Sequence, residues 1–309
     1  MVESLVVVTL ILSLCCKTMS NTIKKAVIPV AGKGTRFLPV TKSVYKTMFP
    51  IINKPTIQYL VEECIKARIE EIIIVISEYQ KDIIDYFDMH SDYYKDLTKP
   101  QKELDELKKI IEQVKITFVI QPELRGLGDA IMCCKEKIGS DDFGVLLGDD
   151  LIMECKPCYG IGDLINQYKE CPAYYIGVKE VKLEDCHKYG IVKVDKTSQK
   201  MKISGMVEKP LENPPSRYAG VGRYILRNNV FDYLKQIKDD HIHEIMLTDA
   251  FRMACMVEDV YAYQFNGTRF DIGDHAGYVK ATIAYALKDE NIKDEIYEYI
   301  KGKVENASN

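Results

Sequence analysis

The chain has 309 residues and a formal net charge of -4, and 47% of its residues are hydrophobic. This length and balance are typical of a soluble globular protein with a sizeable core, and they exclude collagen-like, disordered and multi-span membrane classes. The acidic balance also argues against a general nucleic-acid binder, because such proteins are normally basic.

The first 18 residues form an apolar N-terminal extension. Its apolar run, residues 5–16, is too short for a membrane helix of about 20 residues, and Glu3 stands where a signal peptide carries basic residues. We expect no membrane association, with a short anchor as the alternative, and one domain over residues 19–309. The 10 cysteines are scattered, which favours reduced thiols and a cytoplasmic location.

Apolar strand-like and helical patterns alternate in the first half of the chain. Strands are predicted at residues 26–30, 71–76, 116–120 and 144–147, and helices at 56–67, 81–87, 104–111 and 128–137. Further strands are predicted at 174–181, 191–194, 202–207 and 218–226, followed by helices at 229–237, 245–256 and 278–287. This order predicts an α/β fold with a mixed, mostly parallel sheet flanked by helices.

A basic glycine-rich loop, residues 32–36 (GKGTR), follows the first predicted strand, and no Asp or Glu occurs between Ser4 and Val61. The loop lacks the third glycine of a dinucleotide fingerprint and the GK[ST] of a Walker motif. Exposed backbone N–H groups beside lysine and arginine suit a triphosphate. A solvated basic loop is the alternative, and the lack of nearby acids favours the phosphate site.

Residues 26–42 (AVIPVAGKGTRFLPVTK) resemble the signature of sugar-nucleotide pyrophosphorylases, most closely the bacterial-type UTP:glucose-1-phosphate uridylyltransferases. The likeness continues in order at residues 121–128, 147–150, 189–192, 207–210, 221–224, 244–250 and 270–273. It implies a Rossmann-like nucleotidyltransferase fold and a Mg²⁺ cofactor. The implied substrates are UTP and glucose 1-phosphate, and the implied products are UDP-glucose and pyrophosphate.

The resemblance also implies residue roles. The catalytic cations are Arg36, Lys46 and Lys209, and the nucleotide-binding residues are Ala31, Gly32, Gly34, Gln121 and Gly128. The sugar-binding residues are Gly190, Glu208 and Gly222, and the metal ligands are Asp149 and Asp271. Asp150 and Asp274 are expected to be supporting or solvated.

The chemistry of these side chains agrees with the implied roles. A Gln amide both donates and accepts hydrogen bonds, as uracil requires, and Mg²⁺ takes one or two carboxylates together with phosphate oxygens. Because a sugar phosphate is already anionic at neutral pH, the reaction needs no general base. Positioning and charge neutralisation should supply the catalysis.

Two residues depart from the family pattern beside the glycine-rich loop. Tyr45 and Thr47 stand where the family has Pro and Glu, which leaves the local loop geometry and sugar choice open. Alternatives are a thymidylyltransferase, a uridylyltransferase for another hexose 1-phosphate, or a silent paralogue that only binds nucleotide sugar. The oligomeric state is also open, a homo-oligomer included.

Overall fold

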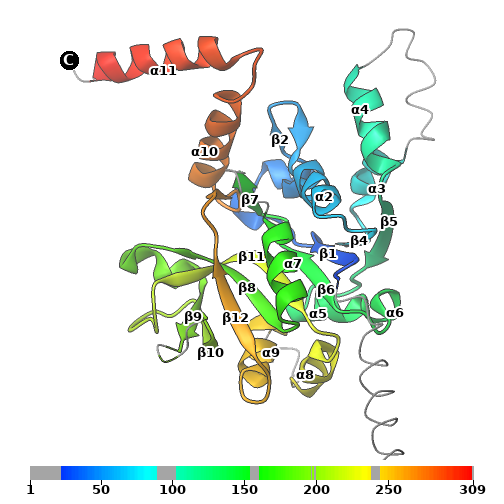
Figure 1. Cartoon of the computed structure of the whole chain (residues 1–309). Coiled ribbons are helices and arrows are strands. Elements are labelled where there is room, and N and C mark those ends of the chain that lie inside the picture. Colours follow the sequence, from blue (N-terminus) through cyan, green and yellow to red (C-terminus); the bar gives the residue numbers. More distant parts are fainter. Residues whose placement is uncertain are drawn as a thin grey trace, which may run out of the picture.

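A computed structural model describes residues 22–88, 102–153, 160–195, 197, 200–237 and 244–307. The apolar extension over residues 1–18 and the expected domain start at Met19 lie outside these ranges. In the described residues, both halves of the chain contribute strands to one nine-stranded sheet (Figure 1).

The main sheet has the order β10-β9-β11-β6-β1-β4-β5, and β8 lies between β11 and β12. Its strands are β1 (Lys25–Pro29), β4 (Glu71–Ile76), β5 (Lys115–Ile120), β6 (Phe143–Leu146), β8 (Tyr174–Glu180), β9 (Gly190–Val194), β10 (Ile203–Glu208), β11 (Tyr218–Leu226) and β12 (Val260–Gln264). Strands β5, β4, β1 and β6 run parallel, and β11 joins them antiparallel to β6. The predicted fold class is confirmed.

Helices cover both faces of the sheet. One face carries α2 (Thr56–Lys66), α3 (Lys81–Phe87), α4 (Lys102–Ile111), α7 (Ile161–Glu170) and α10 (His275–Ala286). The other carries α5 (Leu127–Cys133), α6 (Lys135–Ile138), α8 (Val230–Gln236) and α9 (Leu247–Ala254). The last helix, α11 (Lys293–Ala307), extends away from the sheet (Figure 1).

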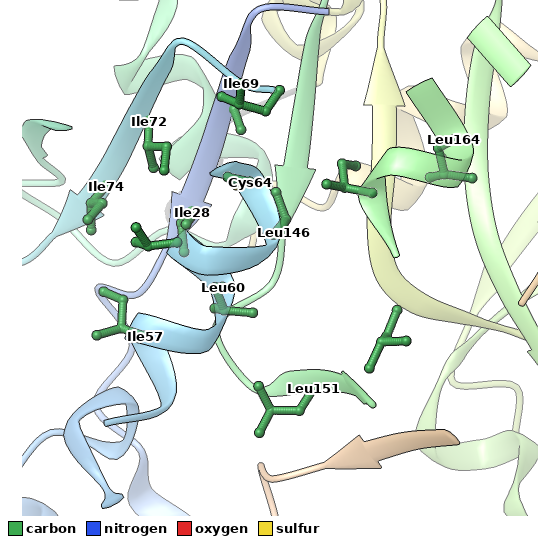
Figure 2. Packing of buried hydrophobic residues seen from close by; sticks show 14 of the residues in the cluster. Ile28, Ile57, Leu60, Cys64, Ile69, Ile72, Ile74, Leu146, Leu151 and Leu164 are labelled. Atoms are coloured by element: carbon green, nitrogen blue, oxygen red, sulfur yellow. The ribbon is translucent and has the colours of Figure 1, made fainter. Parts of the chain in front are cut away.

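Alternate side chains along each strand contact the helices on opposite faces of the sheet. In β4, Ile72 and Ile74 pack on the α2 side, whereas Ile73 and Val75 pack on the α5 side, because successive strand side chains point to opposite faces. Figure 2 shows Ile57, Leu60 and Cys64 of α2 lying over Ile28, Ile72 and Ile74. Each fully buried aliphatic side chain of this kind contributes about 1.5–3 kcal/mol.

Several short strands and 3₁₀ turns lie outside the main sheet. Strand β7 (Asp150–Met153) pairs antiparallel with β13 (Thr268–Asp271), and β2 (Pro50–Ile51) pairs with β3 (Lys54–Pro55). Three 3₁₀ turns, η1 (Thr35–Phe37), η2 (Val40–Lys42) and η3 (Lys46–Met48), follow β1, and η5 (Leu183–Lys188) precedes β9. The glycine-rich loop therefore leads into short turns, where a dinucleotide-binding fold would have a long helix.

The structure differs from the sequence predictions in two respects. The expected helix over residues 128–137 is two helices, α5 and α6, because the N–H of Cys134 bonds to the carbonyl of Ile131, three residues back, and tightens the turn. The 3₁₀ turns and elements β2, β3, β7, α7, β12, β13 and α11 were not predicted. In the described part of the chain, no helix combines the length and the apolar character that a membrane crossing requires.

Candidate active site

A cleft of about 190 Å³ lies beyond the carboxyl ends of β6 and β10 and the start of β9. Its charged lining residues include Arg36, Asp149, Asp150, Lys188, Glu208, Lys209, Arg269 and Asp271. A smaller cavity of about 150 Å³ lies against the glycine-rich loop and is lined by Gly32, Gly34, Lys46 and Thr47 among others. Asp149 lines both spaces. This position is where parallel α/β sheets bind ligands.

The glycine-rich loop is shaped by a left-handed backbone at Gly34, whose φ is 63°. A Cβ there would lie 3.1 Å from Thr41 and 3.3 Å from Lys46, so a side chain would also crowd the lysine. At Gly32 a Cβ would meet nothing within 4 Å, which leaves the backbone open to a ligand. Ala31 is buried behind the loop and lines neither cavity.

The two predicted metal ligands, Asp149 and Asp271, converge around Gly273. A Cβ added to this glycine would lie 2.8 Å from Oδ1 of Asp271 and 3.0 Å from Oδ2 of Asp149. Nη1 of Arg36 would be 3.4 Å from the same point, and it donates a hydrogen bond to the Gly273 carbonyl at 3.3 Å. Two carboxylates and a predicted catalytic cation therefore meet at the edge of the cleft.

Asp149 and Lys46 form an ion pair, with Nζ to Oδ2 at 2.8 Å. The carboxylate side chain is 37% exposed and the lysine 19% exposed. Burial by itself raises the pKa of Asp149, but the nearby Lys46 ammonium outweighs it and the net pKa is lowered. Asp149 is therefore an ionised oxygen donor at neutral pH.

The neighbouring Asp150 has a different environment. Its carboxylate is 6% exposed and accepts a hydrogen bond at 2.6 Å from Nε of Arg269. Burial raises the pKa of Asp150 to about 6, even though Arg269 opposes that shift. Gly222, with φ at 67°, makes room for this carboxylate, because a Cβ there would lie 2.5 Å from Oδ2 of Asp150. Asp150 is therefore buried and paired with Arg269 instead of solvated, and its supporting role stays a prediction.

The carboxylates fit a magnesium ion that arrives with phosphate. In the ranges the structure describes, no group of three or more His, Cys, Asp or Glu side chains could hold a metal without other ligands. Asp149 and Asp271 near the glycine-rich loop offer two hard oxygen donors, and Mg²⁺ commonly combines that number with phosphate oxygens and water.

Residues at the ends of β9 and β10 build the other wall of the cleft. Lys209 has a left-handed backbone, with φ at 43°, and its N–H donates to the carbonyl of Tyr189 at 3.0 Å. Its ammonium lies 3.3 Å from Oε1 of Glu208. A side chain on Gly190 would collide with Met206 and would lie 3.1 Å from the Glu208 carboxylate. A cation and a hydrogen-bond acceptor therefore face the cleft beside a glycine that has no room for a side chain.

Besides Ala31, three predicted site residues do not line either cavity. Gln121 is buried, and its amide donates to Asp129 at 2.7 Å and to the Gly126 carbonyl at 3.2 Å. Gly128 packs so closely that a Cβ would lie 2.8 Å from the Ile245 carbonyl oxygen. Gly222, as described above, accommodates Asp150, and Gly220 lines the cleft instead. Their ligand contacts stay predictions.

The structure also adds a residue that the sequence analysis missed. Arg269 reaches the cleft from β13, with a side chain that is 12% exposed. Its position two residues before Asp271 on a strand places both side chains on the same face, and that spacing was the available signal.

Thr47, the departure from the family pattern, is buried, and its hydroxyl finds no hydrogen-bond partner among the described residues.

Known proteins resemble this chain over most of its length. A nucleotidyl transferase family model matches residues 25–288. The UTP-glucose-1-phosphate uridylyltransferase 2 of Staphylococcus saprophyticus is 44% identical over 283 residues, which cover 90% of this chain and 97% of that protein. The UTP-glucose-1-phosphate uridylyltransferase of Staphylococcus haemolyticus is also 44% identical, with 90% and 98% covered.

Solved structures agree with these relatives. A UDP-glucose pyrophosphorylase complexed with UDP-glucose has a TM-score of 0.79 and 38% identity, and the match covers 86% of this chain and 100% of that one. A UTP-bound UGPase from Acinetobacter baumannii has a TM-score of 0.80 and 37% identity, with 90% and 98% covered. With the fold and the family model in agreement over residues 25–288, this chain belongs to the nucleotidyl transferase family.

Proposed function

We propose that the chain is a UTP:glucose-1-phosphate uridylyltransferase, which makes UDP-glucose and pyrophosphate from UTP and glucose 1-phosphate. The observation that carries the proposal is the position of Asp149, which lines both the cavity against the glycine-rich loop and the cleft. A nucleotide on the loop would place its phosphates beside a sugar phosphate held by Lys209. The similar proteins named above carry this activity in their names.

On the nucleotide side, the open backbone at Gly32 and Gly34 would receive the phosphates of UTP, and Arg36 and Lys46 would neutralise their charge. Asp149 and Asp271 would hold Mg²⁺. When bound, this ion withdraws charge from phosphate oxygens as a Lewis acid. Lys46, which pairs with Asp149 in this structure, would then be released toward a phosphate.

On the sugar side, Glu208 would accept hydrogen bonds from sugar hydroxyls and Lys209 would bind the sugar phosphate. An oxygen of that phosphate attacks the α-phosphorus of UTP in line, the bond from this phosphorus to the β-phosphate bridging oxygen breaks, and pyrophosphate leaves with the electron pair. The attacking oxygen is already ionised, so no side chain has to remove a proton. Alignment of the two substrates and cancellation of their charges lower the barrier.

We also propose a cytoplasmic location. The cysteines that the structure describes, Cys64, Cys133, Cys134, Cys171, Cys186 and Cys255, are all free thiols. Free thiols are usual where the redox environment is reducing, as it is in the cytoplasm.

A pyrophosphate-release assay over a panel of nucleotides and sugar 1-phosphates tests the proposal. The highest kcat/KM should belong to UTP with glucose 1-phosphate, and EDTA should abolish turnover until Mg²⁺ is restored. A higher kcat/KM with dTTP or with another hexose 1-phosphate would assign the chain to one of the alternative transferases. Binding of UDP-glucose without turnover of any pair would identify a silent paralogue.

A further inference from the structure

Two aspartates face each other across the β7–β13 pair. Asp150 and Asp271 are register partners, and like charges placed directly opposite on a sheet destabilise it. Arg269 lies on the same face as Asp271 because the two are separated by one residue. Its Nε lies 2.6 Å from Oδ1 of Asp150, and its Nη2 lies 3.8 Å from Oδ2 of Asp271. One guanidinium therefore serves both carboxylates.

The same guanidinium also reaches the sugar side of the cleft. Its central carbon lies 4.5 Å from the centroid of the Tyr189 ring, within the range of a cation–π contact. The carbonyl of Tyr189 accepts the N–H of Lys209 at 3.0 Å. Contacts through Arg269 and Tyr189 thus connect the two aspartates to Lys209 on the opposite wall of the cleft.

Resting on the function proposed above, we infer that Arg269 is a positioning residue that aligns the two halves of the active site. By pairing with Asp150, Arg269 would keep that carboxylate from joining Asp149 and Asp271 as a ligand of Mg²⁺. By approaching Asp271, it would fix the orientation of that ligand. Through Tyr189 it sets the position of Lys209. Arg269 itself need not touch either substrate.

The role needs arginine in particular. The guanidinium presents donors along two edges and a flat face, whereas a lysine ammonium is a point charge that neither forks nor stacks. Arg269 uses one edge for Asp150 and one face for Tyr189. Arg269→Lys therefore keeps the charge and removes the geometry, which makes it the informative substitution.

The test compares Arg269→Lys and Tyr189→Leu with a control, Arg227→Lys. Arg227 pairs with Glu258 at 2.7 Å and lies outside both cavities. For each protein one measures kcat, both KM values, the thermal midpoint, and the affinity for Mn²⁺ with UTP by electron paramagnetic resonance. Arg269→Lys should lower kcat by about 10²-fold, the scale of a 1 Å misplacement, and should weaken Mn²⁺ binding. Tyr189→Leu should raise KM for glucose 1-phosphate and leave Mn²⁺ binding unchanged.

Three results would overturn the inference. The first is Arg269→Lys with the kcat and Mn²⁺ affinity of the wild type. The second is a loss of activity that only follows a fall in the folded fraction, and the third is an equal loss in the Arg227→Lys control. Failure of the proposed function is distinguishable, because the wild-type enzyme would then make no UDP-glucose while the Mn²⁺ measurements would still report on Arg269.

Discussion

Asp149 and Asp150 are adjacent in the chain, yet they have different partners and different exposure. The Asp149 carboxylate is 37% exposed and pairs with the ammonium of Lys46, whereas the Asp150 carboxylate is 6% exposed and pairs with Arg269. The first has a lowered pKa and the second a pKa of about 6. Only Asp149 lines the cavity against the glycine-rich loop as well as the cleft, whereas Asp150 lines the cleft alone.

The pair makes a matched test of the metal ligand. Asp149→Asn keeps the shape but offers Mg²⁺ a weaker oxygen ligand, so kcat should fall by at least about 10²-fold, the scale of one lost electrostatic contact. The thermal midpoint of Asp149→Asn should change little, since a partly exposed ion pair contributes little to stability. Asp150→Asn should instead lower the thermal midpoint, because Arg269 would lose its buried partner. If Asp149→Asn and Asp150→Asn had equal kcat values at saturating magnesium, Asp149 would not be a metal ligand.

A second prediction at this scale concerns Lys209. Its φ of 43° is tolerated by asparagine, so Lys209→Asn removes the charge without adding backbone strain. KM for glucose 1-phosphate should rise and kcat should fall, with a combined loss of about 10- to 150-fold, equivalent to a charge-assisted hydrogen bond of about 1.5–3 kcal/mol. KM for UTP should stay near the wild-type value.

Lys188 provides the control for that variant. It lines the same cleft but pairs with Asp185 at 2.6 Å, so Lys188→Asn should have a much smaller effect on the sugar phosphate. An equal loss of UTP affinity in Lys209→Asn would place the lysine on the other substrate.

At the scale of elements, one buried ion pair joins α2, β11 and α7. Both oxygens of Glu63 accept from Arg223, at 2.8 and 2.7 Å, and Oε1 also accepts the N–H of Ile161 at 2.7 Å. The Arg223 side chain is fully buried. Since α2 packs on β1 and β4 (Figure 2), this carboxylate ties the first half of the sheet to a strand from the second half.

Glu63→Gln should therefore be strongly destabilising. It leaves the buried Arg223 without a countercharge, a loss of about 3–5 kcal/mol, measured by urea unfolding. Glu62→Gln is the neighbouring control, because Glu62 pairs with the partly exposed Lys54 and should cost under about 1 kcal/mol. Similar urea midpoints for the two variants would contradict the assignment of Glu63 as the junction of these elements.

The elements predicted correctly from the sequence are those with a strong local pattern. Strand β4, Glu71–Ile76, is an unbroken apolar run after its first residue, and the predicted range matches it to the residue. Strands β7 and β13 have only four residues each, and each finds its partner more than a hundred residues away. Their sequences carry no local signal of this pairing, and Arg269 was missed together with them.

At the scale of the whole molecule, the resemblance identified the residues that line the cleft better than those that pack around it. Gly190, Glu208, Lys209, Arg36, Asp149 and Asp271 surround one space although they come from distant parts of the chain. Gln121, Gly128 and Gly222 have interior partners instead. A motif shows that a residue matches a family position, but it does not distinguish a ligand contact from the packing that supports one.

The shared sheet predicts how the whole chain responds to its product. Strands from both halves form one hydrogen-bonded sheet, and the cleft is built from both, so calorimetry should show a single unfolding transition that UDP-glucose shifts as a unit. At a ligand concentration of about 100 times Kd the stabilisation is about 2.7 kcal/mol. With an unfolding entropy of about 2.1 cal/mol/K per residue, the midpoint should rise by about 4 °C.

Lys209→Asn should lose most of this shift while its midpoint without ligand stays close to that of the wild type, because its side chain is 53% exposed and contributes little to the core. Galactose, which lacks both the nucleotide and the phosphate, should leave the midpoint unchanged. Two separate transitions, of which UDP-glucose moved only one, would show that the halves unfold independently. In that case the single domain expected over residues 19–309 would have to be divided, and the cleft would lie between units that the sheet does not hold together.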